Sequence, residues 1–331
     1  MTDARGTDNR GTGKRSTDKR SADKRGAGAE GDARGAPDAA RDRPGLELRA
    51  GASRAVVDPE RGGRLASLRI GGVEILGRGV PGGGAPEAWF DGCFPMAPFA
   101  GRLTGDRVTY GGVSHALPRP SAGVEAAHGV VDRVPWEVRE ASPRRVRLRA
   151  ELARPWPFGG WAEQEIELRE TGIELVLRCG NEEREMPVSL GYHPWFAREA
   201  AGERARLRFA PEARFAPLAP GLFGEPVPGR TSADASRRTA ADASGRAASP
   251  DPAPGSRDDS FLHTGDPEIA WGALRVTLVS SSDVWHVFDA QEPAFCVEPL
   301  TAAPDGLRPE RTRIVGPGAP AELRFGLRWD S

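Results

Sequence analysis

The chain is poor in lysine, although it is rich in basic residues. Its 331 residues include 46 lysines and arginines, and only three of these are lysines: Lys14, Lys19 and Lys24. Schiff-base catalysis, P-loop phosphate binding and kinase-type catalysis each require a positioned lysine. Because all three lysines lie near the N-terminus, in a stretch almost without apolar residues, the sequence excludes these chemistries for a folded domain.

Cysteine is scarce as well. The three cysteines, Cys93, Cys179 and Cys296, are far apart in the sequence. An odd number of widely spaced cysteines fits neither a disulfide framework nor a zinc site of the CxxC type. The sequence therefore predicts a reduced, cytoplasmic protein.

A surplus of charge and long apolar runs are also missing. The 46 basic residues are balanced by 47 acidic ones, which gives a net charge of −1. Proteins dedicated to nucleic-acid binding need a basic surplus to displace counterions, and a membrane-spanning helix needs about 18 or more consecutive apolar residues. Neither nucleic acid nor a membrane is therefore expected as a partner.

Two stretches have too few apolar residues to fold. Residues 2–26 contain five copies of a pentapeptide, such as TDARG and ADKRG, and a period of five matches neither a helix nor a strand. We predict a disordered tail over residues 1–44. A second stretch, residues 226–257, contains the imperfect repeat TSADASRR and TAADASGR and is predicted to be a disordered insert. Residues 45–331, with this insert inside them, are expected to form one domain.

Elsewhere the chain alternates apolar and charged residues. Val146, Leu148 and Ala150 alternate with charged residues, and so do Ile166 and Leu168. A period of two is typical of strands with one buried face. The same period recurs at residues 175–177, 207–209 and 276–278, and turn-forming residues separate these segments. Many short strands between turns predict an all-β fold, a large antiparallel β-sandwich.

Three polar residues stand in contexts that invite a functional interpretation. His128 precedes Gly129, which allows a close backbone approach, and His193 lies in the aromatic segment SLGYHPWF. Aromatic rings beside polar groups suit the faces of a sugar, but they also fit the edge of an aromatic core. Glu298 ends the apolar run 295–297, and a carboxylate at the end of a buried strand must be solvated, paired or functional.

Taken together, four motifs resemble those of the aldose 1-epimerases, the galactose mutarotase-like proteins. They are FPMAPFAGR at residues 94–102, His128-Gly129 followed by Trp136, GYHPWF at 191–196, and FCVEP at 295–299. The resemblance extends from about Leu46 to Trp329, outside the insert. It implies a galactose mutarotase-like supersandwich with a sugar-binding cleft on one sheet, and neither a metal nor an organic cofactor.

The resemblance makes His193 the general acid and Glu298 the general base of a mutarotase. Interconverting two anomers requires ring opening: the base takes the proton of the anomeric hydroxyl while the acid protonates the ring oxygen. With ordinary pKa values of about 4.3 and about 6.5, a glutamate is ionised near neutrality and a histidine can carry and release a proton. Each positioned acid or base typically contributes about 10²–10⁴-fold to the rate.

The same resemblance implies four substrate-binding residues. Arg102 matches an arginine that hydrogen-bonds sugar hydroxyls, and His128 matches a second histidine of the cleft. Asp258 matches a substrate-binding aspartate, although the neighbouring Asp259 fits that position too. His286 falls near a strand position where some relatives place a polar cleft residue.

The sequence departs from the family pattern in places that bear on the choice of sugar. Gly101 stands where many members have an asparagine before the arginine. The His-Gly motif lacks the second glycine of the galactose enzymes, and HPWF replaces their histidine-tyrosine-phenylalanine ending.

Other functions remain open at this point. A hexose-6-phosphate 1-epimerase of the same fold would need a cationic cluster for the phosphate, and the many arginines allow one. A non-catalytic carbohydrate-binding protein would keep the cleft but would have no need of the acid and base. A glycoside hydrolase or polysaccharide lyase is less favoured, because hydrolases use two carboxylates that flank the bond and only Glu298 is suitably placed.

Overall fold

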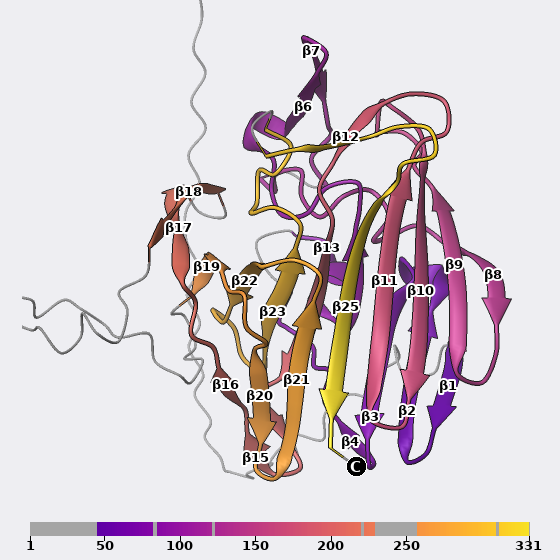
Figure 1. Cartoon of the computed structure of the whole chain (residues 1–331), viewed down its shortest axis with the longest axis vertical. Helices are drawn as coiled ribbons and strands as arrows, with labels where there is room; N and C mark the ends of the chain where they lie inside the picture. Colours follow the sequence, from indigo (N-terminus) through magenta and orange to yellow (C-terminus); the bar gives the residue numbers. More distant parts are fainter. Residues whose placement is uncertain are drawn as a thin grey trace, which may run out of the picture. The chain divides into compact units, whose positions relative to one another are not determined.

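The computed structural model describes residues 45–81, 85–120, 123–219, 222–228, 257–308 and 311–330. Within these residues regular structure is almost entirely β, and every strand pair is antiparallel (Figure 1). The predicted all-β, antiparallel fold is therefore confirmed. The predicted tail, residues 1–44, lies outside the described residues, and so does most of the predicted insert. Residues 226–228 correct the insert's start: they end strand β18 (Leu222–Pro228), because they pair with β17 (Ala213–Ala219).

The larger sheet has eleven strands. Its order is β1 (Leu46–Ala50), β2 (Ser53–Asp58), β3 (Arg64–Ile70), β5 (Cys93–Met96), β13 (Gly191–Ala197), β23 (Ala294–Leu300), β22 (Val284–Phe288), β19 (Asp258–Leu262), β17 and β18, with β4 (Val73–Glu74) paired to β3. Strands from distant parts of the chain are thus neighbours at its centre.

The smaller sheet has eight strands and carries the predicted alternation. Its order is β16 (Arg206–Arg208), β20 (Glu268–Trp271), β21 (Leu274–Ser280), β25 (Ala321–Trp329), β11 (Gly172–Gly180), β10 (Trp161–Arg169), β9 (Arg145–Glu151) and β8 (Glu137–Ala141). In β9, Val146, Leu148 and Ala150 are buried and the charged residues between them face outward. Salt bridges such as Arg147–Glu163, 3.2 Å, cover that outer face.

Short elements connect the two sheets. Three strand pairs stand apart: β6 (Arg107–Tyr110) with β7 (Val113–Ala116), β12 (Met186–Val188) with β24 (Arg313–Val315), and β14 (Glu199–Ala200) with β15 (Glu203–Arg204). The described helices are the 3-10 turns η1 (Pro59–Arg61), η2 (Glu87–Phe90) and η3 (Thr104–Asp106). None of the helices in the described part of the chain has the length and apolar character needed to cross a membrane.

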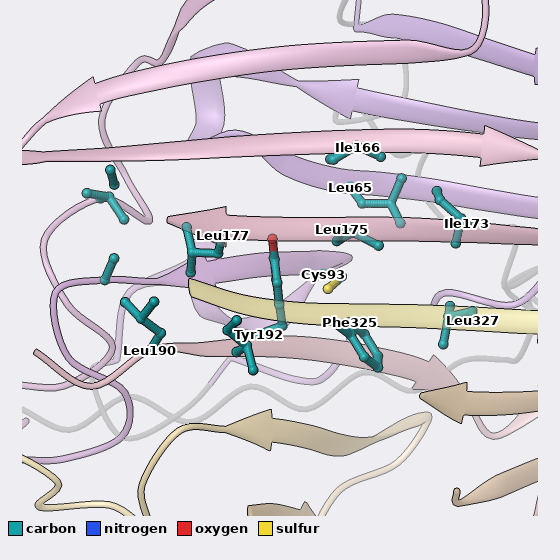
Figure 2. Close-up of a cluster of buried hydrophobic side chains, with 14 of the residues drawn as sticks. Leu65, Cys93, Ile166, Ile173, Leu175, Leu177, Leu190, Tyr192, Phe325 and Leu327 are labelled. Atoms are coloured by element: carbon teal, nitrogen blue, oxygen red, sulfur yellow. The ribbon is translucent and has the colours of Figure 1, made fainter. Parts of the chain in front are cut away.

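A hydrophobic core fills the space between the two sheets (Figure 2). Leu65, Cys93 and Tyr192 of the larger sheet meet Leu175 and Phe325 of the smaller one, and all five are essentially inaccessible to water. Burying a large apolar side chain stabilises the fold by roughly 1.5–3 kcal/mol. Because side chains alternate along a strand, the residues next to these core residues lie on the opposite face of the larger sheet. That face carries the candidate site.

Candidate functional site

A cleft of about 490 Å³ lies on the face of the larger sheet that points away from the core. All six residues that the sequence singles out line this cleft: Arg102, His128, His193, Asp258, His286 and Glu298. They come from three central strands, from β19 and from two loops. The fold thus brings residues that are far apart in the sequence together in one cleft.

The register of the central strands places the polar residues in one row. His193 of β13 pairs with Phe94 of β5, and Glu298 of β23 pairs with His286 of β22. His286 in turn pairs with Ser260 of β19. This cross-strand row (Phe94, His193, Glu298, His286 and Ser260) forms the floor of the cleft, with Phe94 and Ser260 at its buried ends.

His193 and Glu298 meet in the middle of the cross-strand row. His193 Nε2 lies 3.4 Å from Glu298 Oε1, and both side chains are nearly fully buried. The ring of His193 stacks on Phe94 with centroids 4.7 Å apart, and its Nδ1 lies 3.6 Å from Cys296 Sγ. Stacking and the contact with the thiol fix the plane of the imidazole, so that Nε2 points at the carboxylate.

Burial alters the protonation of this pair. Removal from water, together with the smaller effect of the nearby His286, lowers the pKa of His193 to about 3. Burial also raises the pKa of Glu298 to about 7, against the opposing effect of His286. The ordinary values assumed from the sequence do not hold here, because each charged form loses its hydration. Burial therefore favours the neutral forms of both groups.

A second pair adjoins the first. His286 Nε2 lies 3.2 Å from Asp258 Oδ1, and its Nδ1 lies 2.9 Å from Ser260 Oγ. Burial lowers the pKa of His286, but the hydrogen bond to Asp258 and the surrounding carboxylates outweigh it and raise the pKa overall. Likewise, burial favours a higher pKa for Asp258, and the hydrogen bond with His286 turns the shift downward. The pair therefore favours a cationic imidazole beside an anionic carboxylate.

The structure distinguishes Asp258 from its neighbour. Asp258 lines the cleft, whereas Asp259 accepts a hydrogen bond from Arg214 Nε at 2.9 Å. Successive residues of a strand point to opposite faces, so only one of the two can reach the cleft. That residue is Asp258.

Arg102 and His128 are brought together by two loops that pair with each other. Arg102 bridges to Ala127, and the His128 N–H donates to the Gly101 carbonyl at 3.0 Å. The Arg102 side chain is 44% exposed, and its Nε lies 3.8 Å from Glu125 Oε2. It is placed at the mouth of the cleft, where it remains in contact with water.

The backbone at His128 is held in an unusual conformation. His128 has φ of 62°, in the left-handed region, and Gly129 follows with φ of 82°. A Cβ at Gly129 would lie 2.0 Å from the Ala97 carbonyl oxygen, so no other residue fits this close approach. The His128 ring meets Trp89 edge to face with centroids 4.6 Å apart, and burial beside His193 lowers its pKa well below the ordinary value.

Aromatic side chains form the remaining walls. Trp195 stands in the aromatic segment around His193 that the sequence singles out, whereas Trp89 and Phe90 had no such signal. Trp195, two residues beyond His193 on the same face of β13, has Phe90 and Phe288 at centroid distances of 5.8 and 5.9 Å. Trp89 is held by Asp132, whose Oδ2 accepts from the indole Nε1 at 2.6 Å. Phe90 and Trp89 lie on η2, and no local pattern marks this turn as part of the cleft. Flat apolar walls beside hydroxyl-binding polar groups suit a sugar.

A fully buried arginine supports this wall from beneath. Arg64 donates to the backbone carbonyls of Ala88, Asp91 and Asp132, at 2.6, 3.0 and 3.2 Å. Its guanidinium lies 5.5 Å from the centroid of Phe94, whose ring also stacks on His193. Arg64 thereby ties η2 to the cross-strand row.

One group of potential metal ligands occurs among the described residues. It consists of His193, Cys296 and Glu298, whose ligand atoms all lie within 4.8 Å of one another. Burial raises the pKa of the Cys296 thiol well above its ordinary value, which disfavours the thiolate that a metal needs. As it stands, the group is the histidine–glutamate pair with a protonated thiol beside it.

Comparison with known proteins indicates the family and the fold. Residues 44–212 match the family model for aldose 1-epimerase. This match includes Arg102, His128 and His193 and ends before Asp258, His286 and Glu298. No curated protein matches the chain in a sequence search.

Solved structures with the same fold cover nearly the whole domain. A candidate aldose 1-epimerase from Escherichia coli K12 is 20% identical, with a TM-score of 0.70 over 87% of this chain and 99% of that one. A galactose mutarotase-like protein from Clostridium acetobutylicum is 16% identical, with a TM-score of 0.70 over 86% and 94%. Galactose 1-epimerase from Lactobacillus acidophilus NCFM is 15% identical, with a TM-score of 0.64 over 86% and 93%. At these identities the likeness concerns the fold.

Proposed function

We propose, from the premise that this chain belongs to the aldose 1-epimerase family, that it interconverts the α and β anomers of a free aldose. The observation that carries the proposal is the 3.4 Å approach of His193 Nε2 to Glu298 Oε1 on the floor of a sugar-sized cleft. A general acid and a general base must both reach one anomeric centre, and a pair on neighbouring strands meets this requirement. The three free, buried cysteines suit a reducing compartment, so we assign the activity to the cytoplasm.

In the proposed mechanism His193 Nε2 and the Glu298 carboxyl group hold one proton between them. Glu298, as the carboxylate, accepts the proton of the anomeric hydroxyl, while His193 Nε2 gives its proton to the ring oxygen. The bond between C1 and the ring oxygen breaks and C1 becomes an aldehyde. After rotation about the bond to C2, the same two transfers run in reverse and close the ring on the other face.

Burial disfavours the charged form of the pair but leaves its proton count unchanged. A neutral imidazole beside a protonated carboxyl holds the same single proton as an imidazolium beside a carboxylate. One transfer across the 3.4 Å gap converts the first form into the second. Sugar hydroxyls that hydrogen-bond to both groups would supply part of the lost solvation and favour the charged, reactive form.

The other cleft residues suit the holding of an uncharged sugar. Asp258, Arg102 and His128 offer hydrogen-bonding groups around the cross-strand row, and Trp195 offers a flat apolar surface. Such contacts can fix the ring hydroxyls while the aldehyde end remains free to rotate.

An unphosphorylated substrate is favoured over a hexose 6-phosphate. Among the described residues, two arginines line the cleft, Arg102 and Arg119. Arg102 faces Glu125 at 3.8 Å, and Arg119 Nε donates to Asp106 Oδ2 at 2.6 Å. A phosphate needs cations that are not already neutralised by neighbouring carboxylates.

A polarimetric panel tests the proposal. Freshly dissolved α-D-glucose, α-D-galactose, α-D-xylose and glucose 6-phosphate would each be followed to equilibrium with and without the purified full chain. We expect faster mutarotation of at least one free aldose and a smaller effect on the phosphate. Binding of a free aldose, measured by NMR, without any acceleration would instead support a carbohydrate-binding protein.

A further inference from the structure

We propose that Asp305 is a positioning residue for the sugar-binding edge of the cleft. It holds the segment Gly101–Thr104, which carries Arg102, against the loop that follows β23, the strand of Glu298. The inference rests on the proposed function, because it gives Arg102 a contact with the sugar. No sequence motif pointed to Asp305.

The contacts of Asp305 are directed at one segment. Its backbone N–H donates to the Arg102 carbonyl at 2.8 Å. Its Oδ1 accepts from the Thr104 N–H at 3.0 Å, and its Oδ2 accepts from the Thr104 hydroxyl at 2.8 Å. Arg308 Nε also donates to Oδ2. The side chain is only 7% exposed, and both of its carboxylate oxygens accept hydrogen bonds.

Neighbouring residues reinforce the connection. We call residues 304–308 the clip. Pro304 lines the cleft and packs directly on Gly101, where a Cβ would lie 2.7 Å from the proline ring atoms. The Gly101 carbonyl accepts from the N–H of His128. Fixing Gly101–Thr104 therefore also fixes the loop that presents His128.

The backbone of Asp305 indicates that the residue is held in place for these bonds. Its φ is 68°, in the left-handed region that residues other than glycine rarely adopt. Aspartate and asparagine tolerate this conformation better than other residues with a Cβ. A strained, buried acid at a cleft edge is the arrangement expected of a group that positions its neighbours.

These contacts predict a particular kinetic effect. Because Arg102 would bind the sugar and would not transfer protons, loosening its segment should raise KM and leave kcat nearly unchanged. Asp305→Asn suits the test, since asparagine accepts the same φ and can still accept from the Thr104 N–H. Its amide nitrogen, in place of Oδ2, can accept neither from the Thr104 hydroxyl nor from Arg308 Nε, so the clip is weakened and not removed.

The experiment is a double-mutant cycle on mutarotation of the preferred aldose. The variants are Asp305→Asn, Arg102→Ala and both together, with Thr104→Val as a second way to remove one bond of the clip. We expect about a tenfold rise in KM for Asp305→Asn, with kcat within about twofold. In the Arg102→Ala background the further effect of Asp305→Asn should be clearly smaller than in the wild type, because only its influence on the loop of His128 then remains.

A matched control separates positioning from general stability. Glu74→Gln alters another carboxylate that bonds backbone N–H groups, those of Leu68 and Leu76, away from the cleft. This variant should keep the wild-type KM. Independent effects of Asp305→Asn and Arg102→Ala, or an unchanged KM in Asp305→Asn and Thr104→Val, would overturn the inference. If the wild type does not accelerate mutarotation, the proposed function fails, and the same cycle on the dissociation constant of the sugar, measured by NMR, decides the role of Asp305.

Discussion

His193 Nε2 and Glu298 Oε1 lie 3.4 Å apart on neighbouring strands, and both groups are buried. In water their ordinary pKa values would give an imidazole and a carboxylate that are both easily charged. Burial instead lowers the pKa of the histidine to about 3 and raises that of the glutamate to about 7. The catalytic candidates therefore form one unit that shares a proton over a wide pH range.

Replacing Glu298 by glutamine should abolish most turnover and keep binding. Glutamine has nearly the same shape but cannot accept the anomeric proton, so we expect kcat to fall by about 10²–10⁴-fold. Polarimetry would measure the loss, and NMR titration with the preferred aldose would measure binding. Glu322→Gln on the outer face of β25 provides the control and should be fully active. Wild-type turnover in Glu298→Gln would remove Glu298 from the mechanism.

The activity should depend on pH as expected for a pair that must hold one proton. Below about pH 3 the pair gains a second proton, and above about pH 7 it loses its only one. We therefore expect kcat/KM to be flat in mildly acidic solution and to decline as the pH rises through about 7. A profile that continues to rise above pH 8 would contradict the shared-proton mechanism.

His286 should set the position of that decline. As a cation beside the pair it lowers the pKa of both Glu298 and His193. In His286→Gln both pKa values should rise, so the decline of kcat/KM moves to higher pH. If His286 only binds the sugar, the same variant should raise KM and leave the pH at which activity declines unchanged. The pH profile of the variant distinguishes these roles.

Stability should reveal the cost of burying Glu298. Its pKa is about 7 when folded against an ordinary 4.5, so the folded state binds the proton more tightly and stability falls as the pH rises from 4.5 to 7. Above pH 7 the ionised, buried carboxylate therefore lowers the free energy of unfolding by roughly 3 kcal/mol. We expect urea denaturation at pH 8 to show Glu298→Gln more stable than the wild type by up to that amount, with a much smaller difference at pH 4.5.

His193 has the opposite effect on the pH dependence of stability in the wild type. Its pKa is about 3 when folded against an ordinary 6.5, so stability rises as the pH increases from 3 to 6.5. Between pH 4.5 and 6.5 the wild type loses stability through Glu298 and gains stability through His193 as the pH rises. In Glu298→Gln only the gain through His193 remains. Equal stability of variant and wild type at pH 8 would show that burial does not penalise the carboxylate.

The sequence predicts the smaller sheet well because one of its faces meets water. The alternation at Val146, Leu148 and Ala150 corresponds directly to the buried positions of β9. In β13 and β23 every residue but Ala197 is buried, because one face meets the core and the other meets the cleft. With no polar face to give a period of two, the pattern of residues alone does not show which side chains enter the cleft.

Residues brought in by long-range pairing were harder to predict. The choice between Asp258 and Asp259 depends on the register of β19 with β22, in which Asp258 lies opposite Phe288. Trp89 and Phe90 reach the cleft because Arg64 holds their turn through the Ala88 carbonyl. Neither contact has a local signature, whereas His193 and Glu298 stand in motifs that resemble a known family.

We predict that position 101 requires glycine because Pro304 occupies the space that a side chain would need. Gly101 has φ of 65°, and a Cβ there would lie 2.7 Å from Cβ and Cγ of Pro304. Asparagine tolerates this φ, so in Gly101→Asn the clash with Pro304 should dominate and destabilise the protein by about 1–3 kcal/mol. Pro304→Gly removes both clashing atoms, and the double variant should recover most of the stability lost by Gly101→Asn. Urea denaturation of the two single variants and the double variant measures this coupling, and purely additive losses would show that Pro304 does not determine the need for glycine at position 101.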